Sequence, residues 1–597
     1  MKPETQLSPI TTSAPPIPSA DEQILLSLEA HLHARHFSHA CTLLADHLDM
    51  LLDNIPIERL QSLLKFIPVT RQKTCAHFSY FAGIIFMRVG QPDRATAQLH
   101  QASTLYLAAN QQEFALRCAI ELARIYINQE KFQVAAHFLA KEAQPLIEQN
   151  DDIDQRLQAY FFLQMANLAT EIGHLHISND YAQKSLTLYA ETGDLLGQFR
   201  AQLRMARNFI QQGHYGEAQS RLRLARDYFY IGTLGIATEI QLLNAEIHLR
   251  WYQGKINDAL QPAQLYLKLA DRAQLRNARL YARILLGNLY RDRGDFQLAA
   301  QWYDETQSVI NEYNHRPYQP WLDAQRAWLL ILQGEIDQAL SHITSALATT
   351  DHGQKMSFQV SRAVLYLLQR EPEQAELLLQ ESLHFYEQSG DPMAACAIRI
   401  YLANAAWQRG NTAVLVRQLQ TIFQWLEQHN IDALPYWWHP QIVTDVCVQA
   451  LIANIAPCIV DQMIVRRLKH QSIHALARYL DADDLDIRQR VNQLLTKVTG
   501  ENEMLLAHLE ESPAKQVLQE LLESGKLQAE HYLRLEVELM TAKQRRRPNP
   551  TLVAVFALHI HGIKRRTIAE RLECSTENVR NYITAIYQHF DLPASFS

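Results

Sequence analysis

The chain has 597 residues, 48% of them hydrophobic and 20% charged, which is the composition of a folded protein too long for a single hydrophobic core. Its formal net charge is −7, and its 19 glycines are few for this length, which argues against glycine-rich nucleotide-binding loops and favours helices over sheets. Seven cysteines are scattered without a C-x-x-C pair, so we expect buried thiols in a reducing compartment and neither a disulfide framework nor a zinc site.

Residues 1–20 are rich in Pro, Ser and Thr and lack the basic and apolar segments of an export signal, so we expect a disordered N-terminal tail. Residues 21–77 are expected to form an N-terminal helical cap, with room for an extra helical pair around 36–48. No apolar run approaches the ~20 residues that a membrane span requires. The sequence therefore predicts a cytoplasmic protein that does not bind membranes.

The body of the chain, residues 78–430, carries an internal repeat. An anchor residue, usually Gly, is followed five positions later by a small residue, and the anchors recur at intervals of 36 to 43 residues, which is typical of stacked helical pairs. The anchors are Gly90, Glu130, Gly173, Gly213, Gly254, Gly294, Gly334, Arg370 and Gly410. Seven positions before each anchor stands a mostly small residue, such as Gly83 or Gly287, where two helices would pack closely. The pattern predicts an all-α solenoid.

These anchors resemble the tetratricopeptide repeat, with the usual period of ~34 residues stretched by longer helices. The resemblance is to the long-repeat body of the maltose-regulon activator family, which in that family directly precedes a LuxR-type DNA-binding domain. Those activators begin with an ATP-binding domain, but this chain has no G-x-x-x-x-G-K-[ST] motif. The resemblance therefore implies the C-terminal two-thirds of such an activator, without ATP-driven switching and without a cofactor.

In tetratricopeptide arrays the first helix of each pair lines a concave groove, and the position six before each anchor points into it. These positions are mostly polar, and the residues expected to bind a ligand or partner there are Arg124, Asn167, Arg207, His248, Asn288, Trp328 and Asn404. Arg124 and Arg207 flank Asn167 in the series, so we expect them to converge on one strip that favours an anionic or peptide-like ligand. The alternative is a solvated inner surface without a ligand, because an exposed helical face must be polar.

Residues 431–544 have a less regular helical pattern, and we expect them to form a connector that closes the end of the solenoid. Two prolines in 545–550 predict a hinge after it.

Residues 545–597 have the pattern of a helix-turn-helix. Asn549 and Pro550 predict the start of a helix, and Gly562 predicts its end. A short second helix is expected over 563–572, and Ser575 should cap a third. The third helix would bury an apolar face made of Val579, Ile583, Ile586 and Phe590. Its opposite face, which could lie in a DNA major groove, carries Arg580, Asn581, Thr584 and Gln588.

Residues 549–592 resemble the LuxR-type (GerE-type) DNA-binding domain without a gap, through I-A-x-x-L in the second helix and S-x-x-N-V-R-x-Y-I in the third. The family match implies base contacts by Arg580, Asn581 and Thr584. It implies phosphate contacts by Lys564, Arg565, Arg566, Asn578 and Tyr582. The chain departs from the family pattern at Cys574 and Tyr582, and it ends before most of the fourth helix through which this domain often dimerises.

The charge distribution is consistent with a DNA-binding tail. Residues 541–597 carry nine Lys/Arg against four Asp/Glu, a net charge of +5, so the preceding residues carry −12. A basic module on an acidic body binds phosphates while the body is kept off the DNA. The alternative is that the basic run 543–547 is a solvated linker and the three helices form a plain packing unit.

The expected function is a DNA-binding transcriptional regulator, most simply an activator, that is not an enzyme and binds no metal. Its partners would be double-stranded DNA, RNA polymerase, and a peptide, small anionic ligand or partner protein in the groove, and it could form a homo-oligomer. The alternative is a tetratricopeptide adaptor or peptide receptor whose C-terminal domain does not bind DNA directly.

Overall fold

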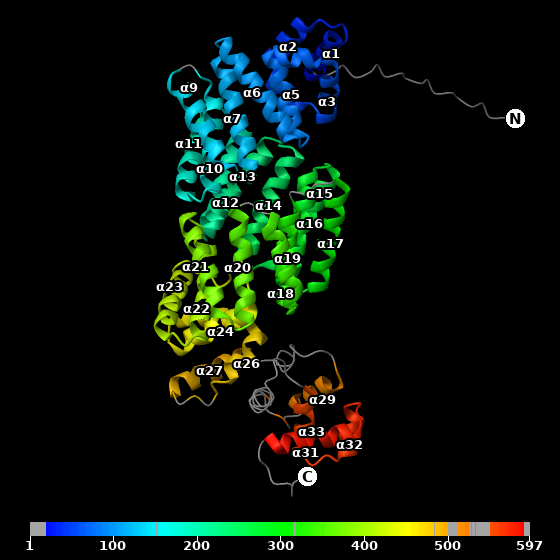
Figure 1. Cartoon of the computed structure of the whole chain (residues 1–597), viewed down its shortest axis with the longest axis vertical. Helices are drawn as coiled ribbons and strands as arrows, with labels where there is room; N and C mark the ends of the chain where they lie inside the picture. The colour runs from blue at the N-terminus through cyan, green and yellow to red at the C-terminus, as the bar shows by residue number, and fades with distance from the viewer. Residues whose placement is uncertain are drawn as a thin grey trace, which may run out of the picture. The chain divides into compact units, whose positions relative to one another are not determined.

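The computed structural model describes residues 20–129, 131–150, 153–313, 318–349, 352–480, 482, 484–498, 512–523, 527, 532 and 550–589. Within these ranges every regular element is a helix, and no strand occurs (Figure 1). None of the described helices is both long and apolar enough to span a bilayer. The predicted disordered tail before residue 20 and the predicted hinge before Pro550 lie outside the described residues.

Helix pairs follow one another through the predicted array and confirm an all-α solenoid. In the described residues the pairs are α5 (Ala76–Arg88) with α6 (Pro92–Ala108), α7 (Gln112–Asn128) with α8 (Phe132–His137), η1 (Phe138–Ala143) and α9 (Gln144–Glu148), α10 (Gln155–Glu171) with α11 (Leu175–Glu191), α14 (Ile236–Tyr252) with α15 (Ile256–Arg272), α16 (Arg276–Arg293) with α17 (Phe296–Tyr313), α18 (Gln319–Gln333) with α19 (Ile336–Thr349), α20 (His352–Leu368) with α21 (Pro372–Gln388), and α22 (Pro392–Gln408) with α23 (Thr412–Gln428). Helices α12 (Leu195–Gln211) and α13 (Tyr215–Ile231) come between α11 and α14 in the chain.

The anchor residues that the structure describes lie at the end of the first helix of a pair, and Glu130 is outside the described residues. Gly294, with φ +98°, ends α16 in the left-handed conformation that glycine adopts without strain. Arg370 takes the same conformation, with φ +66°, in one of the repeats whose anchor is not a glycine. The small residue five positions after an anchor is buried between the two helices, as Ala95, Ala259 and Ala299 show with no exposed surface.

The small residue seven positions before an anchor is required by close helix packing. A Cβ atom built on Gly287 of α16 would lie 2.3 Å from Cε1 of Tyr303 on α17. The Tyr303 hydroxyl passes this glycine and donates to Oδ1 of Asn288 at 2.8 Å. The glycine therefore lets the buried tyrosine ring lie directly against the backbone of α16.

The chain divides into two compact units, residues 1–205 with 224–232 and residues 206–223 with 233–597. The first unit begins with α1 (Ala20–His33), α2 (Phe37–Asn54), α3 (Ile57–Phe66) and α4 (Val69–Thr74). The region where an extra helical pair was expected, 36–48, is a single helix with a kink at His47. The turn falls earlier, at Arg35 with φ +59°, so α2 pairs with α1.

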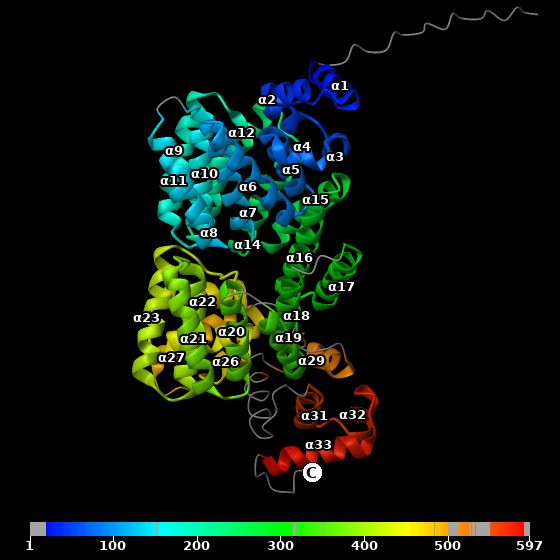
Figure 2. The same cartoon turned by 45° about the horizontal axis from the view of Figure 1, so that its top comes forward.

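The second unit contains the remaining repeats and the helices that follow them. Helices α20 to α23 lie side by side in both views (Figures 1 and 2). The helices after the repeats are α24 (Pro440–Ile452), α25 (Pro457–Gln462), η3 (Met463–Leu468), η4 (Lys469–Ser472), α26 (Ile473–Ala477), α27 (Leu485–Val498) and α29 (Pro513–Glu523). Helix α24 packs on α22 and buries Val443, Val446 and Cys447, so it covers the apolar face of the last repeat.

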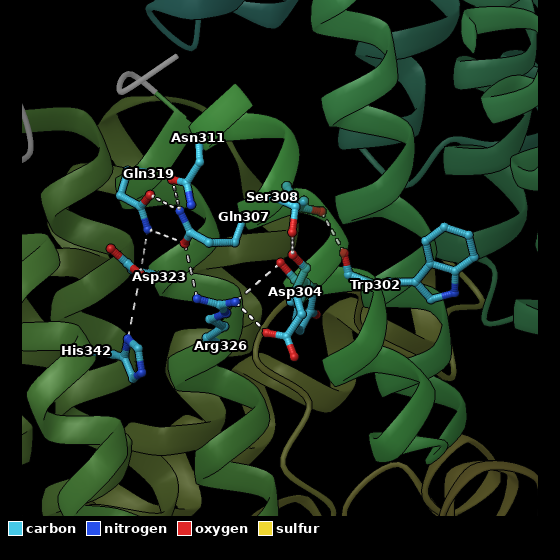
Figure 3. A network of polar contacts seen from close by, with 11 residues as sticks. Trp302, Asp304, Gln307, Ser308, Asn311, Gln319, Asp323, Arg326 and His342 are labelled. Atoms are coloured by element: carbon cyan, nitrogen blue, oxygen red, sulfur yellow. Dashed lines mark hydrogen bonds and ion pairs between the residues drawn. The ribbon is translucent and has the colours of Figure 1, made fainter. Parts of the chain in front are cut away.

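Neighbouring repeats are also joined by a polar network between α17 and α18 (Figure 3). Gln307 and Gln319 exchange two side-chain hydrogen bonds of 2.8 and 2.9 Å. Arg326 donates to Gln307 at 3.2 Å and to Asp304 at 2.6 Å. Because Gln307 and Asp304 lie on one repeat and Gln319 and Arg326 on the next, the network fixes the register of the two.

Candidate nucleic-acid interface and ligand cavity

The C-terminal helices begin and end close to where the sequence predicts. Helix α31 (Pro550–Ile560) starts at the proline, and Gly562, with φ +73°, lies just beyond its end. Helix α32 (Arg565–Arg571) is shorter than the predicted 563–572, because Lys564 is still extended at its N-terminus. Helix α33 (Thr576–His589) is capped by Ser575, whose Oγ accepts from the amide of Asn578 at 3.0 Å.

One face of α33 is packed on α31 and α32. Val579, Ile583 and Ile586 are at most 2% exposed, as the apolar spacing predicts. They join a core that includes Val555 and Ile568 from the other two helices. Phe590, the fourth residue expected on this face, lies outside the described residues.

The opposite face of α33 is polar and solvent-exposed. Arg580, Asn581 and Thr584 are all exposed, and Tyr582 is half-buried. The Arg580 guanidinium lies 3.9 Å from Glu577, with both side chains about two-thirds exposed (66% and 68%). An exposed ion pair at this distance contributes about 0–1 kcal/mol, so it does not hold the arginine away from another anion.

Further cations lie at the beginning of α32. Lys564, Arg565 and Arg566 are exposed, as is Asn578 in the first turn of α33. Arg566 donates to Glu570 at 3.2 Å, again between exposed side chains. These residues and the polar face of α33 make up the candidate nucleic-acid interface.

A helix that sequence reasoning assigned to the connector packs against α31 and forms an ion pair with α32. Helix α29 contacts α31 and buries Val517, Leu518 and Leu521 (Figures 1 and 2). Glu520 of α29 forms an ion pair with Arg571 of α32. The packed C-terminal group of described helices therefore begins at α29, earlier in the chain than residue 545. The signal in the sequence is the apolar spacing of 517, 518 and 521 after Pro513.

Two of the expected groove residues, Arg124 and Asn167, belong to the first unit and bond to residues one turn earlier on their own helices. Arg124 Nε donates to Glu121 at 2.9 Å, and Asn167 donates to Gln164 at 3.0 Å. Glu121 also accepts from the Tyr160 hydroxyl at 3.0 Å. Arg124 and Arg207 lie in different units, so their convergence on one strip stays a prediction.

Three other expected groove residues meet in a cavity of about 240 Å³ in the second unit. His248, Asn288 and Trp328 come from α14, α16 and α18, the first helices of successive repeats. The cavity walls also include the aromatic residues Trp251, Tyr252, Tyr281, Trp321, Tyr436 and Trp437. Its polar lining includes Arg291, Gln325, Ser357 and Ser361. The ligand cavity is therefore aromatic, with amide, hydroxyl and guanidinium groups between the rings.

His248 is held as a neutral ring in this wall. Its Nδ1 lies 2.7 Å from the carbonyl oxygen of Asn244, which can only accept, so Nδ1 carries the proton. Nε2 is then an acceptor for the Tyr281 hydroxyl at 2.9 Å. Burial lowers the pKa of His248 to about 4, although the hydrogen bond to Asn244 opposes the shift. The Tyr281 ring is stacked on Trp321 at a centroid distance of 5.3 Å.

The segment 431–438, which follows the last repeat, supplies another wall of the cavity. The Tyr252 hydroxyl donates to the Tyr436 hydroxyl at 3.1 Å, which donates to Asp391 at 3.2 Å. Burial raises the pKa of Asp391 to about 6. The Tyr401 hydroxyl donates to the carbonyl of Trp437. These bonds tie the segment to α14 on one side and to α22 on the other.

Arg467 of η3 fixes the start of the same segment. Its guanidinium donates to the carbonyls of Gly254 and Gln253 at 2.9 and 3.0 Å, beyond the end of α14, and also to Asp432. The connector therefore contacts the repeats at a point more than 200 residues earlier in the chain.

The remaining two residues predicted to line the groove, Asn404 and Arg207, lie outside this cavity. Asn404 is 1% exposed and bonds to Gln408 at 2.8 Å, and neither it nor Arg207 lines the cavity. Sequence reasoning missed Tyr281 and Trp321, which stand seven residues before Asn288 and Trp328 and so share their helix face. It also missed Tyr436 and Trp437, whose signal is an aromatic run between Pro435 and Pro440.

Fold and site define an all-helical repeat protein. Residues 280–305 and 320–343 match the tetratricopeptide repeat family model, and they fall on α16 with α17 and on α18 with α19. The chain therefore contains tetratricopeptide repeats. A search of curated proteins finds none that matches this sequence.

Solved structures with similar helical arrangements include a Rap protein complexed with competence and sporulation factor, at 14% identity and TM-score 0.41, covering 67% of this chain and 99% of that one. A signal transduction ATPase with a tetratricopeptide repeat sensor from Pyrococcus horikoshii has 13% identity and TM-score 0.33, covering 70% and 74%. Aspartyl phosphate phosphatase F from Bacillus subtilis has 14% identity and TM-score 0.29, covering 69% and 96%. These scores are low, and the similarities support no conclusion about function.

Proposed function

We propose that the protein is a DNA-binding transcriptional regulator whose tetratricopeptide body senses a ligand or partner and controls the C-terminal helices. The observation that carries the proposal is the two-sided character of α33. Val579, Ile583 and Ile586 on its apolar face are buried, and its other face presents Arg580, Asn581 and Thr584 to solvent. A helix presented in this way can enter a DNA major groove and read base edges.

The positions of the other cations support this orientation. Lys564, Arg565 and Arg566 precede or begin α32, on the helix that would cross the phosphate backbone when α33 lies in the groove. The ion pairs of Arg566 and Arg580 join exposed side chains, so exchanging the carboxylates for phosphates costs little. The 541–597 region is also net positive, whereas the rest of the chain is acidic.

The test begins with selection of duplexes from a randomised pool by the full chain, followed by affinity measurements on selected and random DNA. Arg580→Ala should cost about 1–3 kcal/mol on the selected sequence and relax the preference at one base pair. Lys564→Ala should weaken binding to both duplexes alike and reduce the salt slope by about one unit.

Arg417→Ala, an exposed arginine on α23, is the matched control and should leave both affinities unchanged. Equal losses on selected and random DNA for Arg580→Ala would contradict base readout by α33.

The ligand cavity supports the sensing half of the proposal. Its aromatic walls and its ring of side-chain amides and hydroxyls fit a small planar molecule or an aromatic side chain of a peptide. All eight tryptophans of the chain lie between residues 251 and 438, and four of them line the cavity. A ligand bound in the cavity should therefore change the intrinsic fluorescence of the wild type. Trp328→Ala should weaken binding of that ligand and leave the DNA affinity of the unliganded protein unchanged.

The second candidate is a protein-interaction adaptor, which the tetratricopeptide repeats themselves favour. In that case the polar face of α33 would contact protein. The same selection separates the two functions, because an adaptor would enrich no sequence and would retain its affinity for random DNA after Arg580→Ala.

A further inference from the structure

Cys41 and Cys75 form a pair of thiols in the first unit. Cys41 lies on α2 and Cys75 lies directly before α5, and their Sγ atoms are 2.6 Å apart. Both side chains are partly exposed, so a small solute can reach them. Sequence reasoning expected scattered, buried thiols, and it missed this pair because 34 residues separate the two cysteines.

The surroundings of the two sulfur atoms differ. Either thiol can donate in the hydrogen bond between Cys41 and Cys75. This bond, together with the backbone amides of Phe78 and His77 at the beginning of α5, lowers the pKa of Cys75 to about 6. Arg71 on α4 adds to the effect. The same contact raises the pKa of Cys41. A thiolate at a helix N-terminus is the reactive form of cysteine, and a protonated thiol in contact with it is a resolving partner.

The other cysteines lack this arrangement. Cys118, Cys396 and Cys447 are buried, and burial raises the pKa of each of them. Cys458 is exposed in the second unit and serves as a reference for a thiol without a neighbouring cysteine.

We propose that Cys41 and Cys75 are a reversible redox site at which a peroxide oxidises Cys75 and Cys41 then closes a disulfide between α2 and α5. In the first step the Cys75 thiolate attacks one peroxide oxygen, the O–O bond breaks, and the second oxygen leaves with a proton as water or an alcohol. Cys75 is oxidised by two electrons to a sulfenic acid, and the peroxide is reduced.

In the second step the Cys41 sulfur attacks the Cys75 sulfur, the S–O bond breaks, and hydroxide leaves with the Cys41 proton as water. A dithiol reductant returns both cysteines to thiols and is itself oxidised to a disulfide. The bridge encloses α3 and α4 in a closed loop, so the oxidised first unit should unfold at a higher temperature than the reduced one.

The test uses the full chain, treated with a small excess of hydrogen peroxide and then alkylated under denaturing conditions. Mass spectrometry should find two fewer alkylated cysteines and a linked pair of peptides containing Cys41 and Cys75, and dithiothreitol should restore both. The oxidised wild type should show a melting transition raised by about 5 °C.

The single variants separate the two roles. Cys41→Ser should stop the reaction at the sulfenic acid, which a dimedone probe captures on Cys75, whereas Cys75→Ser should leave Cys41 unmodified. Cys458→Ser should behave as the wild type. Circular dichroism of each variant checks that it is folded. Peroxide treatment that leaves Cys41 and Cys75 free while Cys458 is oxidised, or equal dimedone capture in both single variants, would overturn the proposal.

Discussion

The ligand cavity and the polar face of α33 both carry arginine and amide side chains. The two sites differ in the burial and the hydrogen bonding of their arginines. In the cavity Arg291 donates to Gln325 at 2.7 Å and to Asp292 at 2.7 Å, and its side chain is only 6% exposed. On α33 the Arg580 side chain is 66% exposed, and its nearest carboxylate oxygen is 3.9 Å away. Buried groups with short hydrogen bonds favour a small ligand that fits a fixed shape, whereas exposed cations in weak surface ion pairs favour a large polyanion.

The largest expected effect comes from breaking the packing on which the cavity depends. Gly287→Val would place side-chain atoms inside the space occupied by Tyr303, where a Cβ alone lies 2.3 Å from the ring. We expect unfolding to become easier by about 3 kcal/mol, because the buried tyrosine ring must move away from α16. Tryptophan fluorescence during denaturant unfolding measures this, since every tryptophan lies between residues 251 and 438.

Gly216→Ala is the control for this substitution. A Cβ on Gly216 of α13 meets no atom within 4 Å, so alanine should be neutral or slightly stabilising. If both variants unfolded alike, the close packing of Tyr303 on Gly287 would not be what stabilises this part of the fold.

The pH dependence of folding stability tests the burial of His248 in the cavity wall. Its pKa is about 4 in the folded protein and about 6.5 in an unfolded chain, so between pH 6.5 and 4 only the unfolded chain gains a proton. The stability that the neutral ring contributes above pH 6.5 is therefore lost on acidification, by about 1–3 kcal/mol for a half-buried ring.

His248→Gln should make the fluorescence-monitored stability fall less over this window, because glutamine does not titrate. The glutamine side-chain oxygen can still accept from the Tyr281 hydroxyl, which keeps the hydrogen bond of the wild type. His439, whose pKa burial also lowers to about 4, remains in the variant and adds to the residual slope. Asp391 and Asp445, whose pKa burial raises to about 6, oppose it, because they gain a proton in the folded protein first. An unchanged slope in His248→Gln would mean that the ring is protonated as readily in the folded protein as in the unfolded chain.

Removing one hydroxyl from the wall should have the smallest effect. Tyr436→Phe breaks the hydrogen bonds from Tyr252 and to Asp391, and we expect a loss of about 1 kcal/mol in unfolding free energy. Tyr230→Phe, at a position that is 69% exposed, is the control and should change nothing measurable. A loss below the error of the measurement would show that other contacts hold segment 431–438 in place.

Local sequence rules were enough to predict the helices. They could not predict contacts between residues that are far apart in the chain. The end of α16 at Gly294 and the cap of α33 at Ser575 follow from residue types at their own positions. The bond between Tyr252 and Tyr436 joins residues 184 positions apart, so no spacing pattern could predict it. The packing of α29 on α31 is nonlocal in the same sense, because it depends on which apolar helix faces pack against each other in the fold.

The residues predicted to line the groove share one spacing but have two kinds of environment. Arg124 and His248 are equivalent in the repeat, yet Arg124 pairs with Glu121 on its own helix while His248 meets Tyr281 from the next repeat. The carboxylate three residues before Arg124 was visible in the sequence and could have predicted a local pair. What lies opposite His248 could be known only from the fold.

The central claim is that the polar face of α33 binds duplex DNA, and the salt dependence of binding tests it most directly. Fluorescence anisotropy of the full chain with selected and random duplexes, from low to physiological salt, gives the slope of log K against log salt. We predict a negative slope on both duplexes, a selected-to-random affinity ratio of at least about 10³, and a large loss of that ratio in Arg580→Ala. A slope near zero, or a ratio of one that Arg580→Ala leaves unchanged, would contradict the claim.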